Sequence, residues 1–122
     1  MKDIKDNIIV VKSTEFAVEI VKACNWLRKE KKEWVMSEQL LKSGTSIGAN
    51  IREGIRGQSS ADFYAQFNVS LKEASETDYW LELLFLSGYF DKTLYDDLNL
   101  KCQELIRLLM SIVKHKDTPQ KL

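Results

Sequence analysis

Apolar residues recur every three or four positions along most of this chain, which is the spacing of one face of an α-helix. We expect Ser13 and Ser37 to be N-caps, and an apolar stripe follows each of them. The two stripes consist of Phe16, Ile20, Ala23, Cys24 and Leu27, and of Leu40, Gly44, Ile47, Ile51 and Ile55. They predict helices over residues 13–32 and 37–56, preceded by an extended lead-in at residues 1–12.

Polar and glycine residues then mark two further helices. Ser59 and Asp62 have the spacing of a capping box, and Gly88 is suited to the residue just past a helix end. They predict a third helix over residues 60–87. Asp91 or Thr93 opens a fourth, over residues 91–115, whose apolar stripe includes Leu98, Leu105 and Leu109.

Four amphipathic helices joined by short connections predict an all-α fold, an antiparallel up-down-up-down four-helix bundle formed by one domain of residues 1–122. Composition agrees with this prediction, because 44% of the residues are hydrophobic and the chain has only 1 proline and 5 glycines. A chain of 122 residues can therefore bury a core without disulfides or metals.

Charge and cysteine usage narrow the functional class. The 18 basic and 18 acidic side chains cancel, whereas a protein that grips phosphate backbones usually has a basic excess. The sequence has no apolar run long enough to span a membrane and no secretory leader pattern. Cys24 and Cys102 lie far apart and predict reduced, buried thiols. We therefore expect a cytoplasmic protein.

Two blocks of sequence carry a family resemblance. QLLKSGTSIGANIREG at residues 39–54, followed by GQSSADF at 57–63, and LKEASETDYWLELL at 71–84 closely resemble a family first noticed as open reading frames within intervening sequences of bacterial 23S rRNA genes. KSTEFAVEIV at residues 12–21 fits more loosely. The resemblance implies a small four-helix bundle that assembles as a homopentameric ring, and no biochemical activity is known for most members.

A related branch of that family comprises the accessory proteins of diversity-generating retroelements, which bind nucleic acid and a reverse transcriptase. Those proteins are strongly basic, and this chain is neutral. The resemblance to that branch therefore implies the fold more directly than the role.

The first of these blocks also has a physical reading. A polar stripe borders the apolar stripe of the second helix and consists of Ser43, Ser46, Asn50 and Glu53. We expect a buried polar seam in which Asn50 and Glu53 bond to the third helix, at Ser70, Glu73 or Thr77; the alternative is a ligand-binding site at the same seam. Gly44 and Gly48 predict that this helix approaches a neighbour closely.

Residues with the chemistry of catalysis or metal binding are poorly placed. His115, the single histidine, lies at the predicted end of the last helix, and no Glu-x-x-His motif is present. Glu73 and Glu76 lie three apart on one helix, and Arg52 or Arg56 is expected to neutralise them. We therefore predict no catalytic residues, no metal, no cofactor, no small-molecule substrate and no enzymatic activity.

The third predicted helix has two apolar faces where a monomer needs one. Phe63, Phe67 and Ala74 fall on the first face, which we assign to the core. The second face predicts an oligomer interface that consists of Val69, Tyr79, Trp80, Leu83 and Leu86. The alternative is that residues 1–12 fold over this second face.

These patterns predict a non-enzymatic, homo-oligomeric scaffold or interaction protein whose partner is itself. The alternative is a nucleic-acid-binding accessory factor that contacts RNA or DNA through Arg28, Lys32, Lys42, Arg52 and Arg56. These cations can also form an ordinary solvated face. Residues 61–90 carry five acidic side chains and one lysine, so nucleic acid could meet only the first two helices, and we expect weak binding.

Overall fold

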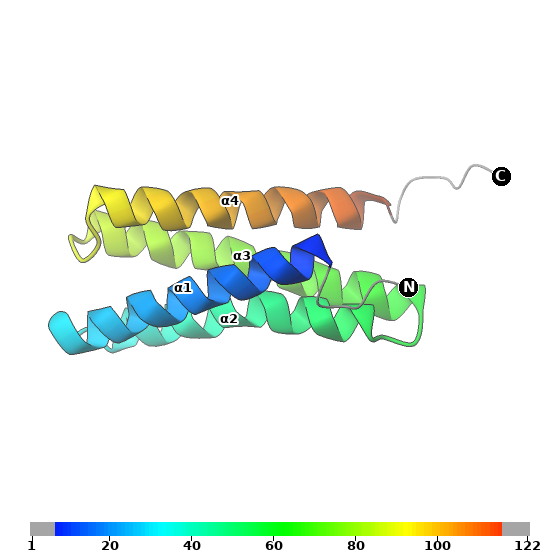
Figure 1. Ribbon diagram of the computed structural model, residues 1–122, viewed down its shortest axis with the longest axis horizontal. Helices are drawn as coiled ribbons and strands as arrows, with labels where there is room; N and C mark the ends of the chain where they lie inside the picture. Colours follow the sequence, from blue (N-terminus) through cyan, green and yellow to red (C-terminus); the bar gives the residue numbers. More distant parts are fainter. Residues whose placement is uncertain (1–6, 116–122) are drawn as a thin grey trace.

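The computed structural model describes residues 7–115, which form four helices: α1 (Ile8–Glu30), α2 (Val35–Ile55), α3 (Ser60–Leu86) and α4 (Lys92–Lys114). They pack as a bundle, and the connecting loops lie at alternating ends of its long axis (Figure 1). The predicted all-α class is therefore confirmed. Within residues 7–115, none of the helices combines the length and apolar character that crossing a bilayer requires.

The first helix begins earlier than predicted. Asn7 is its N-cap, and the Asn7 side-chain oxygen accepts a hydrogen bond from the backbone N–H of Ile9. Ser13 is not a cap; it is buried inside the helix and donates to the carbonyl of Val10. The β-branched run 8–11 costs a few tenths of a kcal/mol per residue in helix propensity. Burial of Ile9 and Val10 outweighs that cost. Residues 8–12 are thus helical, and residues 1–6 lie outside the described part.

The second helix also begins earlier than predicted, at Val35 instead of Ser37. Ser37 is buried in the first turn, and the position before the helix, Trp34, makes no side-chain capping bond. The carboxylate of Glu33 takes over this role by accepting from the backbone N–H groups of Val35 (3.2 Å), Met36 (3.2 Å) and Ser37 (2.7 Å). A carboxylate that satisfies three free N–H groups at the positive end of a helix fixes the α1–α2 connection.

The remaining helix ends agree with the sequence. Ser59 caps α3 by accepting from the N–H of Asp62, and Asp91 caps α4 by accepting from the N–H of Leu94. Gly88 follows α3 with φ +85°, a conformation that L-residues with a side chain rarely adopt. These three residues set the length of α3 and the position of the α3–α4 loop.

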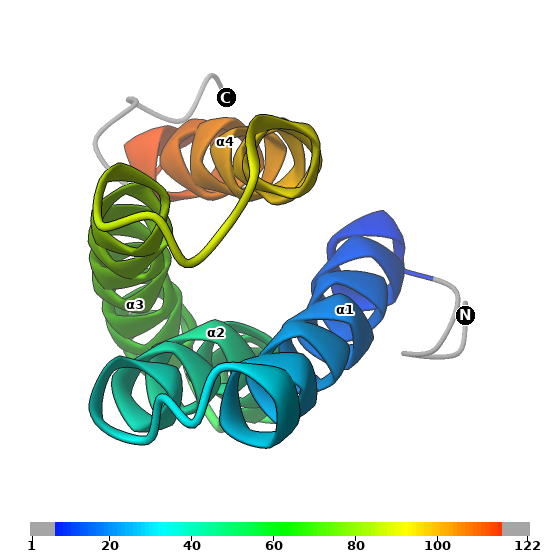
Figure 2. The ribbon, with the colours of Figure 1, turned by 90° about the vertical axis from the view of Figure 1, so that its left-hand side faces the viewer.

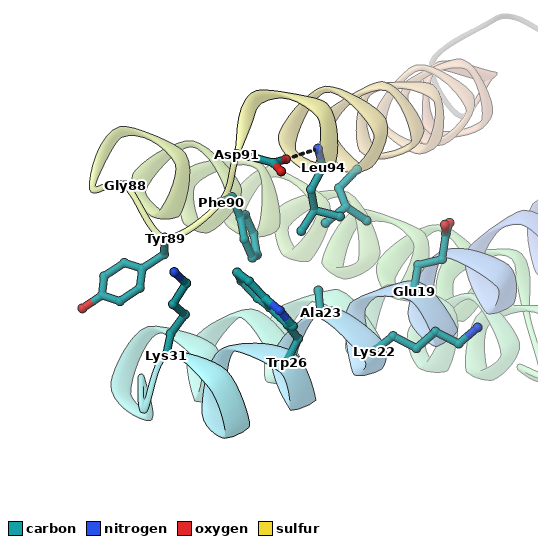
Figure 3. A pocket seen from close by; sticks show the side chains of 11 residues that line it. Glu19, Lys22, Ala23, Trp26, Lys31, Gly88, Tyr89, Phe90, Asp91 and Leu94 are labelled. Carbon is teal, nitrogen blue, oxygen red and sulfur yellow. Dashed lines mark hydrogen bonds between the residues drawn. The ribbon is translucent and has the colours of Figure 1, made fainter.

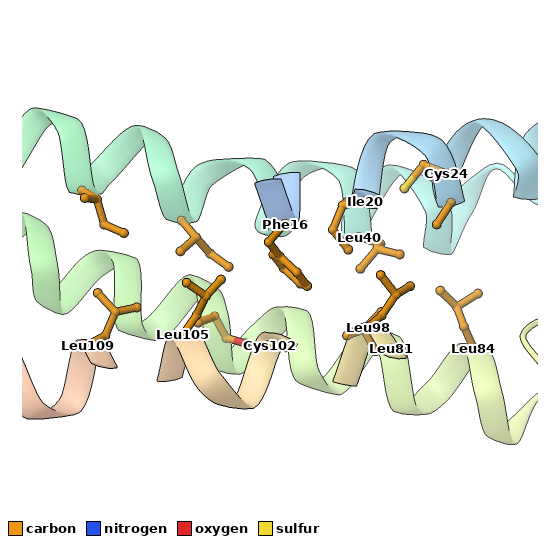
Figure 4. Close-up of a cluster of buried hydrophobic side chains, with 14 of the residues drawn as sticks. Phe16, Ile20, Cys24, Leu40, Leu81, Leu84, Leu98, Cys102, Leu105 and Leu109 are labelled. Atoms are coloured by element: carbon orange, nitrogen blue, oxygen red, sulfur yellow. Dashed lines mark hydrogen bonds between the residues drawn. The ribbon is translucent and has the colours of Figure 1, made fainter. Parts of the chain in front are cut away.

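One hydrophobic core runs along the bundle between all the helices. Phe16 and Ile20 of α1 and Leu40 of α2 face Leu81 of α3 and Leu98 of α4 (Figure 4). Viewed from the end, the helices follow one another around the core, with α1 and α3 on opposite sides (Figure 2). The contact between α1 and α4 is the sparsest of the four neighbouring pairs. That side of the bundle is therefore the most open.

The close approach predicted from the glycines of α2 is made toward α1. A Cβ atom at Gly44 would lie 2.9 Å from Cγ2 and 3.0 Å from Cγ1 of Ile20, and one at Gly48 would lie 3.2 Å from Oγ of Ser13. Ile20 is fully buried and β-branched, so it has little freedom to move. The absence of a side chain at these positions lets the two helices pack at this separation.

We predict that Gly44→Ala destabilises the protein. The added methyl gains about 1 kcal/mol of helix propensity, but crowding against Ile20 costs about 1–3 kcal/mol. Urea unfolding should show a net loss of roughly 1 kcal/mol. Gly48→Ala is the matched control, because its methyl meets a small serine at a longer distance and should cost less. A Gly44→Ala variant more stable than the wild type would show that α1 and α2 are not held this closely.

Candidate functional site

The polar seam between α2 and α3 exists, but different residues form it. Ser43 is buried, and its Oγ lies 2.9 Å from Oγ1 of Thr77. Ser70 is fully buried and donates to the carbonyl oxygen of Ile47 at 2.7 Å. Thr77 Oγ1 lies 2.8 Å from the carbonyl oxygen of Glu73 in its own helix. Two hydroxyl contacts therefore join the helices inside an otherwise apolar core.

The prediction that Asn50 and Glu53 are buried and bond across this seam is wrong. Glu53 is exposed, and Asn50 is half-buried and donates to the carbonyl of Ser46 in its own helix. Ser46 likewise donates within α2, to the carbonyl of Lys42. At about 100° per residue, Ser46 lies roughly 60° and Glu53 roughly 80° to one side of Ser43 around the helix, so both point away from α3. No buried side-chain nitrogen or oxygen of the described residues lacks a partner, so the seam offers no free polar group to a ligand.

The five predicted nucleic-acid contacts do not form one patch. Arg28 and Lys32 lie beside the α1–α2 loop, whereas Arg52 and Arg56 lie at the other end of α2. That helix has 21 residues and is therefore about 30 Å long. Arg28 donates to Ser37 and lies over the Trp34 ring, and Arg52 donates to Thr14. The cations at the two ends are thus separated, and two of them already have partners.

Lys42 belongs with the acidic pair of α3. Burial raises the pKa of Glu73, the neighbouring Glu76 raises it further, and Lys42 lowers it. Lys42, rather than Arg52 or Arg56, is thus the cation whose charge acts on Glu73, while Glu76 accepts from the indole N–H of Trp80.

The thiols are buried and unsuited to chemistry. Cys24 donates to the carbonyl of Ser37, and Cys102 donates to the carbonyl of Ala74. Burial raises the pKa of each thiol to about 12. Both therefore remain protonated at neutral pH and are weak nucleophiles. Within residues 7–115, no group of three histidine, cysteine or acidic side chains could hold a metal ion.

The outer face of α3 carries apolar side chains in water. Leu86 is 70% exposed, Tyr79 58% and Val69 40%, and Leu83 and Trp80 are half-buried. These five residues are called the α3 strip below. Tyr79 and Trp80 also pack edge to face, with ring centroids 5.0 Å apart. None of the described residues of the bundle covers this strip completely.

The open side of the bundle contains a groove that the sequence did not predict. It lies between the second half of α1 and the α3–α4 loop, has a volume of about 640 Å³, and is called the α1–loop groove below. Its lining consists of Glu19, Lys22, Ala23, Trp26, Lys31, Gly88, Tyr89, Phe90, Asp91, Leu94 and Leu98. Trp26 and Phe90 point toward one another across it, with ring centroids 6.3 Å apart (Figure 3). The aromatic pair directly after Gly88 was the available signal in the sequence.

Comparison with known proteins gives a consistent assignment. A family model described as "23S rRNA-intervening sequence protein" matches residues 5–111. A crystal structure of a protein of unknown function from the S23 ribosomal protein family of Bacteroides thetaiotaomicron is 52% identical to this chain. The match covers 87% of this chain and 98% of that one, with a TM-score of 0.86. No match was found among the curated proteins.

We predict that Ser70→Ala and Asn50→Ala differ in their effect on stability. Ser70 loses a fully buried bond between helices, which should lower the free energy of unfolding by about 1 kcal/mol. Asn50 loses only a bond within its own helix, and its change should stay within about 0.5 kcal/mol. Urea unfolding of both variants measures the contrast. Equal losses would restore Asn50 to the seam.

Proposed function

Because the chain belongs to the family of 23S rRNA-intervening sequence proteins, we propose that it is a non-enzymatic, self-assembling interaction protein whose first partner is a second copy of itself. The observation that carries this proposal is the α3 strip. Soluble monomers rarely leave such a row of apolar and aromatic side chains in water, and rows of this kind usually mark contact surfaces.

The spacing of the α3 strip supports a contact between helices. One side of α3 carries apolar residues at helical spacing, with separations of ten, four and three residues between Val69, Tyr79, Leu83 and Leu86. This is the spacing with which a helix packs along another helix. Ala65 extends the same side toward the start of α3.

The family resemblance favours a closed ring of five antiparallel four-helix bundles as the assembled form. In a ring of this kind each copy presents one surface to the copy before it and a different surface to the copy after it, and the ring closes when the rotation from copy to copy adds up to a full turn. We place the protein in the cytoplasm, where a reducing environment suits two buried, unpaired thiols. The protein acts without a cofactor or a small-molecule substrate in this proposal.

A second candidate function is nucleic-acid binding. The description of the family favours it, because that description names 23S rRNA. The charge distribution opposes it. Arg28 and Lys32 are separated from Arg52 and Arg56 by the length of α2, and α3 carries the acidic excess of the chain. Contacts with several adjacent phosphates are needed for tight, salt-sensitive binding.

We predict that the protein is oligomeric at micromolar concentration and that Leu86→Glu dissociates it. The Leu86 side chain is mostly in water, so a glutamate there should leave the fold intact while its charge opposes burial at a contact. Light scattering coupled to gel filtration gives the mass, and circular dichroism checks the helix content. Met110→Glu is the matched control, because Met110 is an equally apolar and 55% exposed residue of α4. A monomeric wild type would refute the proposal.

We also predict weak binding to nucleic acid, with a dissociation constant above about 1 µM at physiological salt. Fluorescence anisotropy with labelled RNA and DNA at about 50 and 200 mM salt tests this and gives the salt dependence. Nanomolar, strongly salt-dependent affinity that Arg52→Glu abolishes would instead establish the second candidate function.

A further inference from the structure

The α1–loop groove has an apolar floor and a charged rim. Ala23, Phe90 and Leu98 are buried at its floor, and Trp26 is 38% exposed along its wall. Leu94 points into the same space from α4 (Figure 3). An aromatic wall above an apolar floor suits one or a few apolar side chains of a partner.

The rim of the groove carries free positive charge. Its two acidic groups already have partners: Glu19 accepts from Lys101 at 2.7 Å, and Asp91 accepts from the N–H of Leu94 at 2.8 Å. Lys22 forms no ion pair with the described residues, and the Lys31 ammonium lies over the Trp26 ring, 5.5 Å from its centroid. A partner with acidic side chains beside its apolar ones therefore complements the groove.

The end of the α3 strip has this chemistry. Tyr79, Leu83 and Leu86 are apolar or aromatic, and the exposed carboxylates of Glu76 and Glu82 lie on either side of them along the helix surface. Glu82 has no cationic partner among the described residues and is one of the acidic groups that raise the pKa of Tyr95, after burial. Apolar side chains between two carboxylates match an aromatic groove between two lysines.

The α3 strip cannot fill the groove of its own molecule. The groove is formed by α1, the α3–α4 loop and the start of α4, whereas α3 itself lies on the other side of the bundle from α1 (Figure 2). Pairing of two α3 strips is disfavoured, because residues 61–90 hold five acidic side chains and one lysine, and like charges would face each other. The groove and the strip are thus complementary surfaces on opposite sides of one molecule.

We propose that the α1–loop groove receives the α3 strip of a second copy of this chain, with Lys22 and Lys31 facing Glu76 and Glu82. This inference rests on the proposed self-assembly and names the surface that α3 meets. Because the two surfaces differ, every contact leaves one groove and one strip free for the next copy. Such a head-to-tail contact produces a ring or an open chain and never a closed dimer.

A mixing experiment tests the head-to-tail contact. Leu86→Glu places a negative charge in the α3 strip and leaves the groove unchanged. The double variant Lys22→Glu/Lys31→Glu reverses the charge of the groove's rim and leaves the α3 strip unchanged. Each variant alone should be monomeric at concentrations where the wild type is assembled. An equimolar mixture should form a 1:1 dimer and nothing larger, because only one productive contact is left.

Two further variants complete the design. Arg56→Glu/Arg107→Glu makes the same change of charge at exposed residues that do not line the groove, and it should assemble as the wild type does. Adding Glu76→Lys/Glu82→Lys to the Lys22→Glu/Lys31→Glu variant reverses both sides of the contact, and the mass should return to that of the wild type.

Three results would overturn the inference. The first is a Lys22→Glu/Lys31→Glu variant that assembles like the wild type while Leu86→Glu is monomeric, which leaves self-assembly standing but places the second surface elsewhere. The second is a mixture of the two variants that stays monomeric, which excludes this pairing of surfaces. The third is a monomeric wild type, which removes the proposed function together with the inference.

Discussion

The close packing of α2 against two neighbours at once is the constraint on which the rest of the bundle depends. Gly44 lets it approach Ile20 of α1, and Gly54 lets it approach Phe67 of α3, where an added Cβ would lie 2.8 Å from the ring. A residue with a side chain at either position would push one neighbour away. These two contacts draw α1 and α3 onto α2, so they end on opposite sides of the molecule, and α4 closes the core mainly against α3.

That arrangement accounts for both unpartnered surfaces. Since α1 is drawn toward α2, its contact with α4 is the sparsest of the four neighbouring pairs, and at the surface it includes the ion pairs of Lys12 with Glu104 and of Lys101 with Glu19. Pairs as exposed as these contribute little to stability. Beside the α3–α4 loop, α1 and α4 leave room for the α1–loop groove. The outer side of α3 is left in water because α2 and α4 already occupy its inner side.

Sequence patterns located the helices because helix periodicity and local caps are encoded by neighbouring residues. Ser59, Gly88 and Asp91 act within one turn of their own position. The sequence identifies Ser59 and Gly88 directly, and Asp91 as one of two candidates beside Thr93. The caps of α1 and α2 were misassigned because Ser13 and Ser37 are serines whose side chains are buried. Asn7 and Glu33 cap instead, and the choice between such candidates depends on which positions the tertiary packing buries.

The polar seam and the groove show why sites are harder to predict than helices. Ser43, Asn50 and Glu53 share one stripe on a helical wheel, but only Ser43 contacts the buried Thr77. Asn50 bonds within its own helix, and Glu53 lies in water. The groove joins residues more than sixty positions apart, such as Trp26 and Phe90. Local periodicity does not show on which side of a helix its neighbour lies. It also does not show which residues far apart in the sequence come into contact.

The neutral total charge conceals a separation that has physical consequences for assembly. The acidic excess lies in residues 61–90, and the compensating positive charge is spread over the other helices, including the rim of the groove. Contacts between unlike faces are therefore attractive, and contacts between two α3 faces are repulsive. In the proposed assembly, this distribution opposes symmetric pairing of two α3 faces and is compatible with a head-to-tail contact. The same separation places carboxylates beside the α3 strip, which opposes contact of that strip with phosphate.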